Sequence, residues 1–197
     1  FLIGLVQSTA PIQDEEQWQD FFESPPDAAT LFQWFAPIAD YFVLDGDGVR
    51  FMQDRDMDES DGVVCGIDAL LIDAPGASSV DKNVDHFVKR NTVRAMCPDC
   101  IPVALYTLQL NAPAGGAGHR TSLRGGGPLT TLVVESPTGT LWRDLWMNVQ
   151  PLSVFVDQSR CGDARHTEAY FKFPWTSAIS AIQKSGTETQ PAQVHPL

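Results

Sequence analysis

Two cysteines separated by two residues, Cys97 and Cys100, have the clearest capacity for chemistry in this sequence. Two thiolates at this spacing can bind one zinc ion from the same side of a tight turn, but a closed zinc site needs four ligands. The remaining cysteines, Cys65 and Cys161, stand alone without paired spacing. We therefore expect Cys97 and Cys100 to supply half of a metal site, whose other half is absent or lies outside these residues.

Two other interpretations of the Cys97-Pro98-Asp99-Cys100 motif stay open. A redox dithiol normally follows a strand and opens a helix, whose N-terminus lowers the thiol pKa. The long irregular segment expected before Cys97 and the proline at position 102 fit that arrangement poorly. Alternatively, the two residues are ordinary buried thiols without a function.

A glycine-rich segment with nearby arginines is the second candidate for chemistry. Gly115-Gly116-Ala117-Gly118 is followed by His119 and Arg120, which imitates a phosphate-binding loop. A nucleotide-binding loop requires Lys directly after its last glycine, so NTP hydrolysis is not predicted. Backbone N–H groups in such a segment can still approach phosphates or base edges closely, and Arg120 and Arg124 add positive charge. The alternative is a turn that only joins two elements.

Other catalytic and metal-binding patterns are missing from the sequence. Residues 54–61 are acidic, but Glu59 and Cys65 occupy the positions where a calcium-binding EF-hand requires Gly and Glu. No G-x-S-x-G elbow occurs, and the four histidines have no metal-binding spacing. Nothing in the sequence therefore points to a catalytic triad.

The distribution of charge favours contact with a polyanion in one region. The formal net charge of −12 over 197 residues argues against nucleic acid when it is taken as a whole. Between Lys82 and Arg124, however, six basic residues accompany only two acidic ones. The basic residues are Lys82, Lys89, Arg90, Arg94, Arg120 and Arg124. This asymmetry indicates a basic surface on an acidic body, and the alternative is a solvated loop that happens to be basic.

The composition is that of a soluble globular protein, with 43% hydrophobic and 19% charged residues. No apolar run reaches the roughly 18 residues that span a bilayer. We interpret Phe1 to Val6 as the cut end of a helix, so that the true N-terminus is missing. Four cysteines are too few for a disulfide scaffold of this length, and a reduced cytoplasmic setting is expected.

Hydrophobic periodicity and turn residues predict one α+β domain, a mixed globular fold with long irregular loops. Helices are expected at residues 1–8, 15–22, 30–42 and 141–152, strands at 51–53 and 129–134, and helix or strand at 64–72 and 101–110. Within residues 30–42, one apolar face is expected from Leu31, Trp34, Phe35, Ile38, Tyr41 and Phe42. A long loop is expected from Pro75 to Asp99, around the basic residues, and loops of this length are usually functional or disordered.

Several ordered motifs together resemble one family. They are Phe51-Met52-Gln53, Cys97 with Cys100, Asn111 to Gly118, Ser122 to Thr131, Leu145 to Val149, and Pro174-Trp175. In type and order these motifs resemble CasA, the large subunit of the type I-E CRISPR complex Cascade. The resemblance covers nearly the whole chain. It implies that residues 1–197 are an internal part of the N-terminal domain of longer family members, without their first strands and C-terminal four-helix bundle.

The resemblance implies a non-catalytic role in finding foreign DNA. A glycine loop, matching Ala114 to Gly118, would enter the minor groove at the short motif beside the target (the PAM), and the subunit would aid duplex opening. The family usually has Gly where this chain has Ala114. A second loop, matching Phe87 to Arg94, would contact the RNA end and nearby DNA. The family's second cysteine pair and its remaining motif-reading residues would lie beyond Leu197.

The expected partners are other Cascade subunits, CRISPR RNA, double-stranded target DNA and a helicase-nuclease, with zinc as a possible structural cofactor. The residues expected to bind nucleic acid are Phe87, Lys89, Arg90, Arg94, Ala114, Gly115, Gly116, Ala117, Gly118, Arg120 and Arg124. The alternatives are a small enzyme centred on zinc or on the dithiol, and a purely structural interaction module.

Overall fold

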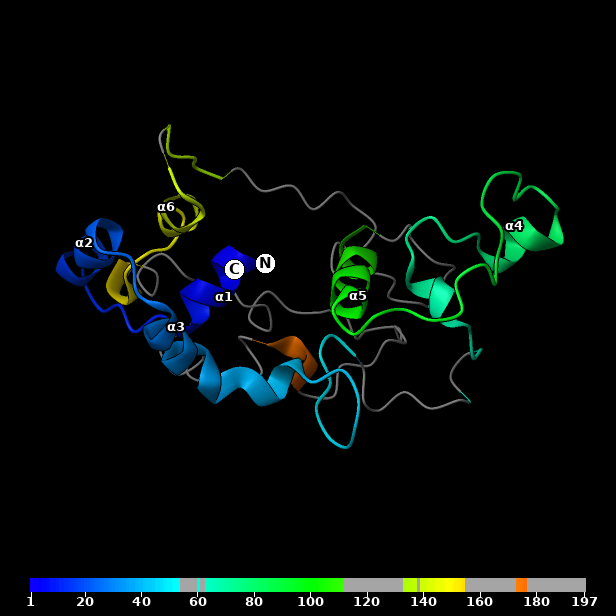
Figure 1. Ribbon diagram of the computed structural model, residues 1–197, viewed down its shortest axis with the longest axis horizontal. Coiled ribbons are helices and arrows are strands. Elements are labelled where there is room, and N and C mark those ends of the chain that lie inside the picture. The colour runs from blue at the N-terminus through cyan, green and yellow to red at the C-terminus, as the bar shows by residue number, and fades with distance from the viewer. Residues whose placement is uncertain (54–59, 61–62, 112–132, 138, 155–172, 177–197) are drawn as a thin grey trace, which may run out of the picture. The chain divides into compact units, whose positions relative to one another are not determined.

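The computed structural model describes residues 1–53, 60, 63–111, 133–137, 139–154 and 173–176 (Figure 1). The chain divides into two compact units. The first comprises Phe1–Val43, Thr131–Thr176 and Thr189–Leu197, and the second comprises Leu44–Thr130 and Ser177–Glu188. The assignment of residues 1–197 to one partial domain of a larger subunit stays a prediction.

Three short helices open the first unit: α1 (Leu2–Thr9), α2 (Glu15–Glu23) and α3 (Ala28–Phe35). α1 ends because Ala10 is extended and Pro11 has no N–H with which to continue a helix. α2 begins where the Asp14 carboxylate accepts a hydrogen bond of 2.9 Å from Gln17 N. The helices predicted at residues 1–8 and 15–22 are thereby confirmed.

The predicted helix at 30–42 is only partly α-helical. Asp27 caps α3 by accepting from Thr30 N at 2.8 Å, and after Phe35 the chain tightens into the 3-10 helix η1 (Ala36–Phe42). Pro37 lies in the first turn of η1, where it removes an α-helical hydrogen bond. The apolar face is confirmed, since all six residues expected on it are partly buried, whereas residues 32, 33, 36, 37, 39 and 40 are exposed.

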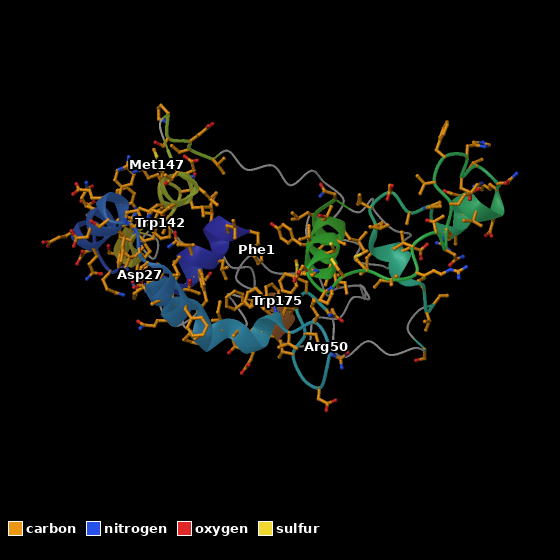
Figure 2. All side chains as sticks on the ribbon, in the orientation of Figure 1. Phe1, Asp27, Arg50, Trp142, Met147 and Trp175 are labelled. Carbon is orange, nitrogen blue, oxygen red and sulfur yellow. The ribbon has the colours of Figure 1, made fainter. Side chains whose placement is uncertain are left out.

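The core of the first unit forms around α6 (Leu141–Trp146), which Figure 1 shows near α1 and α2 and whose tryptophans also contact the ring of Trp34 in α3. Trp146 is fully buried and stacks on Trp142, with ring centroids 4.7 Å apart. Its indole N–H donates to Trp18 O at 2.9 Å, and the indole of Trp142, labelled in Figure 2, donates to Phe21 O at 2.9 Å. These indoles therefore bury their ring area without leaving the ring N–H unpaired.

The helix predicted at 141–152 ends earlier, at Trp146. Met147 begins a turn in which Asn148 N and Val149 N donate to the carbonyls of Leu145 and Trp146. Val149 still lies in the core, so the expected apolar stripe is kept although the helix is not. A further indole hydrogen bond joins the end of η1 to η5 (Pro174–Thr176), because the indole N–H of Trp175 donates to Tyr41 O at 2.7 Å.

No β-strand occurs in the part of the chain that the structure describes, so the strand component of the predicted α+β class is not confirmed. The strand expected at residues 51–53 is wrong, because Met52 has a φ of 54° and Gln53 N donates to Arg50 O, which makes a turn. Of the strand expected at 129–134, Val133 and Val134 are irregular, and the rest lies outside the described residues.

In the second unit, the two segments for which the sequence allows either helix or strand both contain helix. The 3-10 helix η3 (Ile67–Leu70) lies within residues 64–72, and α5 (Cys100–Asn111) covers residues 101–110 and packs on η3. The long loop expected between them contains one short helix, α4 (Ala77–Asp81), and is otherwise irregular. No helix among the described residues is both long and apolar enough to cross a bilayer.

Candidate nucleic-acid interface

The basic loop, residues 87–94 of the second unit, begins with a wholly exposed aromatic ring. Phe87 is 100% exposed, although burying such a side chain would stabilise the fold by about 1.5–3 kcal/mol. Isolated exposed apolar residues are common, but this ring lies in a segment that also carries three cations. The aromatic residue that the family resemblance singles out is thus exposed, and its role in binding stays a prediction.

The three cations of the basic loop, Lys89, Arg90 and Arg94, are all exposed. Lys89 Nζ lies 3.2 Å from the Asp85 carboxylate, with the lysine side chain 55% exposed. The Asp85 side chain is only 9% exposed, so its carboxylate needs this partner, whereas the exposed Lys89 ammonium has further donors that can contact a phosphate. Arg90 donates its Nε to Pro75 O at 2.6 Å, which orients the guanidinium and leaves its four other N–H donors for further partners.

The backbone of the basic loop is held by a side chain that the sequence analysis did not single out. Asp68 in η3 is buried, with 6% of its surface exposed, and its carboxylate accepts from Asn91 N. Asn91 has a φ of 62°, a conformation that asparagine adopts more readily than most residues. The available signal was an acidic residue inside the apolar run of residues 64–72.

The two cysteines of the pair lie close together at the start of α5. Cys97 O accepts from Cys100 N at 3.0 Å and from Ile101 N at 3.2 Å, which makes the tight turn that opens the helix. Both residues are exposed and free, so the interpretation as buried thiols is wrong. Pro102 lies in the first helical turn, where a missing N–H costs nothing, and the sequence-based objection to a helix here is also wrong.

A hydrogen bond between the two thiols makes their pKa values differ. The Cys100 side chain donates to the Cys97 sulfur, which lowers the pKa of Cys97, helped by backbone donation from Cys100 and opposed by the charge of Asp99. The same bond raises the pKa of Cys100, since ionisation of Cys100 would remove the donor. Cys97 therefore loses its proton before Cys100 as the pH rises.

The pair fits half of a tetrahedral zinc site. Two cysteine sulfurs side by side on a tight turn are the right donor type and spacing. Within the described parts of the chain, no third Cys, His, Asp or Glu joins them in a group that could hold a metal. Cys65 Sγ instead donates to Val63 O at 3.4 Å, and Cys161 lies outside the described residues.

The glycine-rich candidates lie outside the described residues. These are Ala114, Gly115, Gly116, Ala117, Gly118, Arg120 and Arg124. The structure does place the residues on either side of them in sequence. Asn111 ends α5, where its side chain donates to Thr107 O at 3.1 Å, and Val134 is held against α6 by the side chain of Asn148.

The second unit thus presents an exposed aromatic ring and three exposed cations on one loop. The sequence matches the family of the CRISPR-associated protein Cse1 over residues 1–197. The chain belongs to this family, for which CasA is the other name, and the resemblance stated from its motifs is confirmed. The family makes it a component of the CRISPR Cascade complex.

Proposed function

We propose that this chain is the non-catalytic subunit with which a type I-E Cascade complex recognises the motif beside its DNA target. The observation that carries the proposal is the basic loop, where the fully exposed ring of Phe87 accompanies the exposed cations Lys89, Arg90 and Arg94. An aromatic ring can stack on an unpaired base while nearby cations bind its phosphates. We assign this loop to the end of the CRISPR RNA and the adjacent DNA.

The same proposal assigns the glycine-rich residues 114–118 to the minor groove of the motif. Small residues let a backbone approach base edges, and Arg120 and Arg124 would bind flanking phosphates. The protein then needs only modest positive charge, because RNA pairing reads the target sequence and the protein reads a short motif. In the assembled complex, the subunit would also help to open the duplex and to recruit the helicase-nuclease.

We further propose that Cys97 and Cys100 bind a structural zinc ion together with two ligands outside the described residues. Their separation across one turn supports this. Zinc would fix the start of α5, which follows the basic loop in sequence. Titration of the protein with a chelator should release zinc, and Cys97→Ser should lower the bound zinc measured by elemental analysis. Equal zinc content in Cys97→Ser and the parent protein would contradict this assignment.

The nucleic-acid proposal is tested through the salt dependence of DNA binding by the assembled complex. Removal of one cation that binds a phosphate should reduce the slope of log K against log salt by about 1, so we expect this for Lys89→Ala, Arg94→Ala, Arg120→Ala and Arg124→Ala. Arg50→Ala is the matched control, since Arg50 is a cation of the same unit that lies outside the basic stretch from Lys82 to Arg124. Slopes that equal the control in all four variants would overturn the proposal.

A further inference from the structure

Asp68 is a buried carboxylate whose partner in the basic loop is a main-chain N–H and not a cationic side chain. It lies in η3 and is the one buried charged residue among those that the structure describes. Its carboxylate accepts the main-chain N–H of Asn91, 23 residues further along the chain. Because a buried carboxylate is unfavourable unless it is hydrogen-bonded or paired, this contact is the physical reason for an acidic residue at that position.

The contact fixes the middle of the basic loop at a single backbone group. Asn91 follows Lys89 and Arg90, and its left-handed conformation turns the chain there. Arg90 Nε donates to Pro75 O on one side of Asn91, and Thr92 Oγ1 donates to Lys89 O on the other. Residues 89–92 of the basic loop are thus held by neutral and acidic acceptors from their own unit.

We propose that Asp68 is a positioning residue for nucleic-acid binding, which holds the basic loop in its binding conformation before the nucleic acid arrives. This inference rests on the proposed function of the loop. A loop that is already ordered does not have to be ordered on binding, so a larger fraction of the protein is competent to bind. Asp68 itself need not touch the nucleic acid.

Charge and positioning predict opposite effects for the loss of Asp68. If the carboxylate acted only through its charge, its removal would strengthen polyanion binding, because a repulsive negative charge near the loop would be gone. If it positions the loop, its removal weakens binding despite the gain in net positive charge. The sign of the change therefore separates the two roles.

Gly66 provides a second variant that leaves every charge in place. A Cβ at Gly66 would lie 2.8 Å from Asp68 Oδ1, so Gly66→Ala must displace the carboxylate. The backbone at Gly66, with φ −68° and ψ 163°, is open to alanine without strain. Gly66→Ala should therefore disturb the contact between Asp68 and Asn91 without altering the charge of the loop.

The experiment compares variants in the complex assembled with its CRISPR RNA, using a target duplex as the probe. Asp68→Ala and Gly66→Ala should each weaken binding by about three- to tenfold with an unchanged salt slope, because the fraction of competent loops falls while the cations remain. Hydrogen exchange of the Asn91 amide should become faster in both variants. Asp68→Asn keeps a side-chain oxygen as acceptor and should restore most of the affinity.

Asp73→Ala is the matched charge control, since Asp73 is an exposed acidic residue three positions from η3. It should leave binding unchanged or slightly tighter and should not alter exchange at Asn91. If Asp68→Ala binds as tightly as Asp73→Ala while Lys89→Ala still lowers the salt slope, the positioning role is overturned and the proposed function stands. If none of Lys89→Ala, Arg94→Ala, Arg120→Ala and Arg124→Ala lowers the slope, both are overturned.

Discussion

The side chain of Asn148 pairs with the main chain of Val134 in the way that a neighbouring β-strand would. Its Oδ1 accepts from Val134 N at 2.8 Å, and its Nδ2 donates to Val134 O at 2.9 Å. The same Nδ2 also donates to Asp144 O at 2.7 Å, which ties the amide to α6. One side chain thus anchors the segment that follows the glycine-rich residues in sequence, without a strand being present at Val134.

Loss of the Asn148 amide should free this segment. We expect Asn148→Ala to lower the free energy of unfolding by roughly 1–2 kcal/mol, since two hydrogen bonds to Val134 and one to Asp144 disappear while the exposed groups of Val134 can turn to water. Urea denaturation measures the loss, and hydrogen exchange at the Val134 amide should become faster. Asn148→Asp keeps an acceptor for Val134 N and should be intermediate at that amide. Identical exchange at Val134 in the Ala variant would contradict the anchoring role.

Trp146 should be the most sensitive position in the first unit. It is fully buried and contacts the rings of Trp18, Phe21, Trp34 and Trp142. Trp146→Ala should cost about 3–5 kcal/mol of unfolding free energy through the cavity that it leaves. Trp146→Phe should cost less, about 1–3 kcal/mol, because the main loss is the indole donor to Trp18 O.

Circular dichroism during urea denaturation can follow both Trp146 variants without relying on tryptophan fluorescence. Phe32→Ala is the matched control on α3, because Phe32 is 74% exposed and its removal should change stability by no more than about 0.5 kcal/mol. A Trp146→Ala protein as stable as the Phe32→Ala protein would show that the aromatic cluster is not the core of this unit.

Local signals in the sequence predicted the first two helices of the first unit and the buried face of the segment from Leu31 to Phe42. Asp14 and Asp27 are helix caps whose effect depends only on the next three residues, and the aromatic spacing from Leu31 to Phe42 reflects which face is buried. The strand prediction at residues 51–53 failed because three residues are too few to show a periodic pattern. At residues 51–53 a buried Phe51 followed by the left-handed Met52 forms a turn, which alternation alone cannot distinguish from a strand.

Only part of the candidate site could be predicted from the sequence. Local charge singled out Lys89, Arg90 and Arg94, and the family resemblance added Phe87. The structure leaves all four exposed. The contact between Asp68 and Asn91 was not predictable, because it joins residues that only the tertiary fold brings together. For the cysteine pair, Pro102 does not argue against a helix, because proline is tolerated in a first helical turn. Whether the glycine-rich residues bind DNA stays a prediction.

The Asp27 cap should make the stability of the first unit depend on pH. The hydrogen bond from Thr30 N lowers the pKa of Asp27 below its ordinary value in the folded state. A lowered folded-state pKa means that the stabilisation is present above the unfolded-state pKa and is lost as the pH falls through the folded-state pKa. Asp27→Ala should therefore be less stable than the parent protein at pH 7, and the difference should vanish in acid.

The measurement for the Asp27 cap is the urea midpoint at a series of pH values between neutrality and the acid limit of folding. Asp40→Ala removes the same charge from an exposed position in η1 and controls for general electrostatics. The cap is refuted if Asp27→Ala and Asp40→Ala show the same difference from the parent protein at every pH.

Cys97 should react with an alkylating agent before Cys100 and at a pH below that of an ordinary thiol. The thiolate is the nucleophile, and the hydrogen bond from Cys100 lowers the pKa of Cys97 while it raises that of Cys100. In metal-free protein, the rate of iodoacetamide modification at each cysteine, followed by mass spectrometry across pH, should rise first for Cys97.

Two substitutions at Cys100 then isolate the cause of the low Cys97 pKa. Cys100→Ser retains a hydroxyl donor to the Cys97 sulfur and should preserve most of the shift, whereas Cys100→Ala removes the side-chain donor and should move the Cys97 profile to higher pH. If the Ala and Ser variants titrate alike, the thiol hydrogen bond is not the cause. Added zinc should protect Cys97 in the parent protein if the pair binds the metal, because a coordinated thiolate is no longer a free nucleophile.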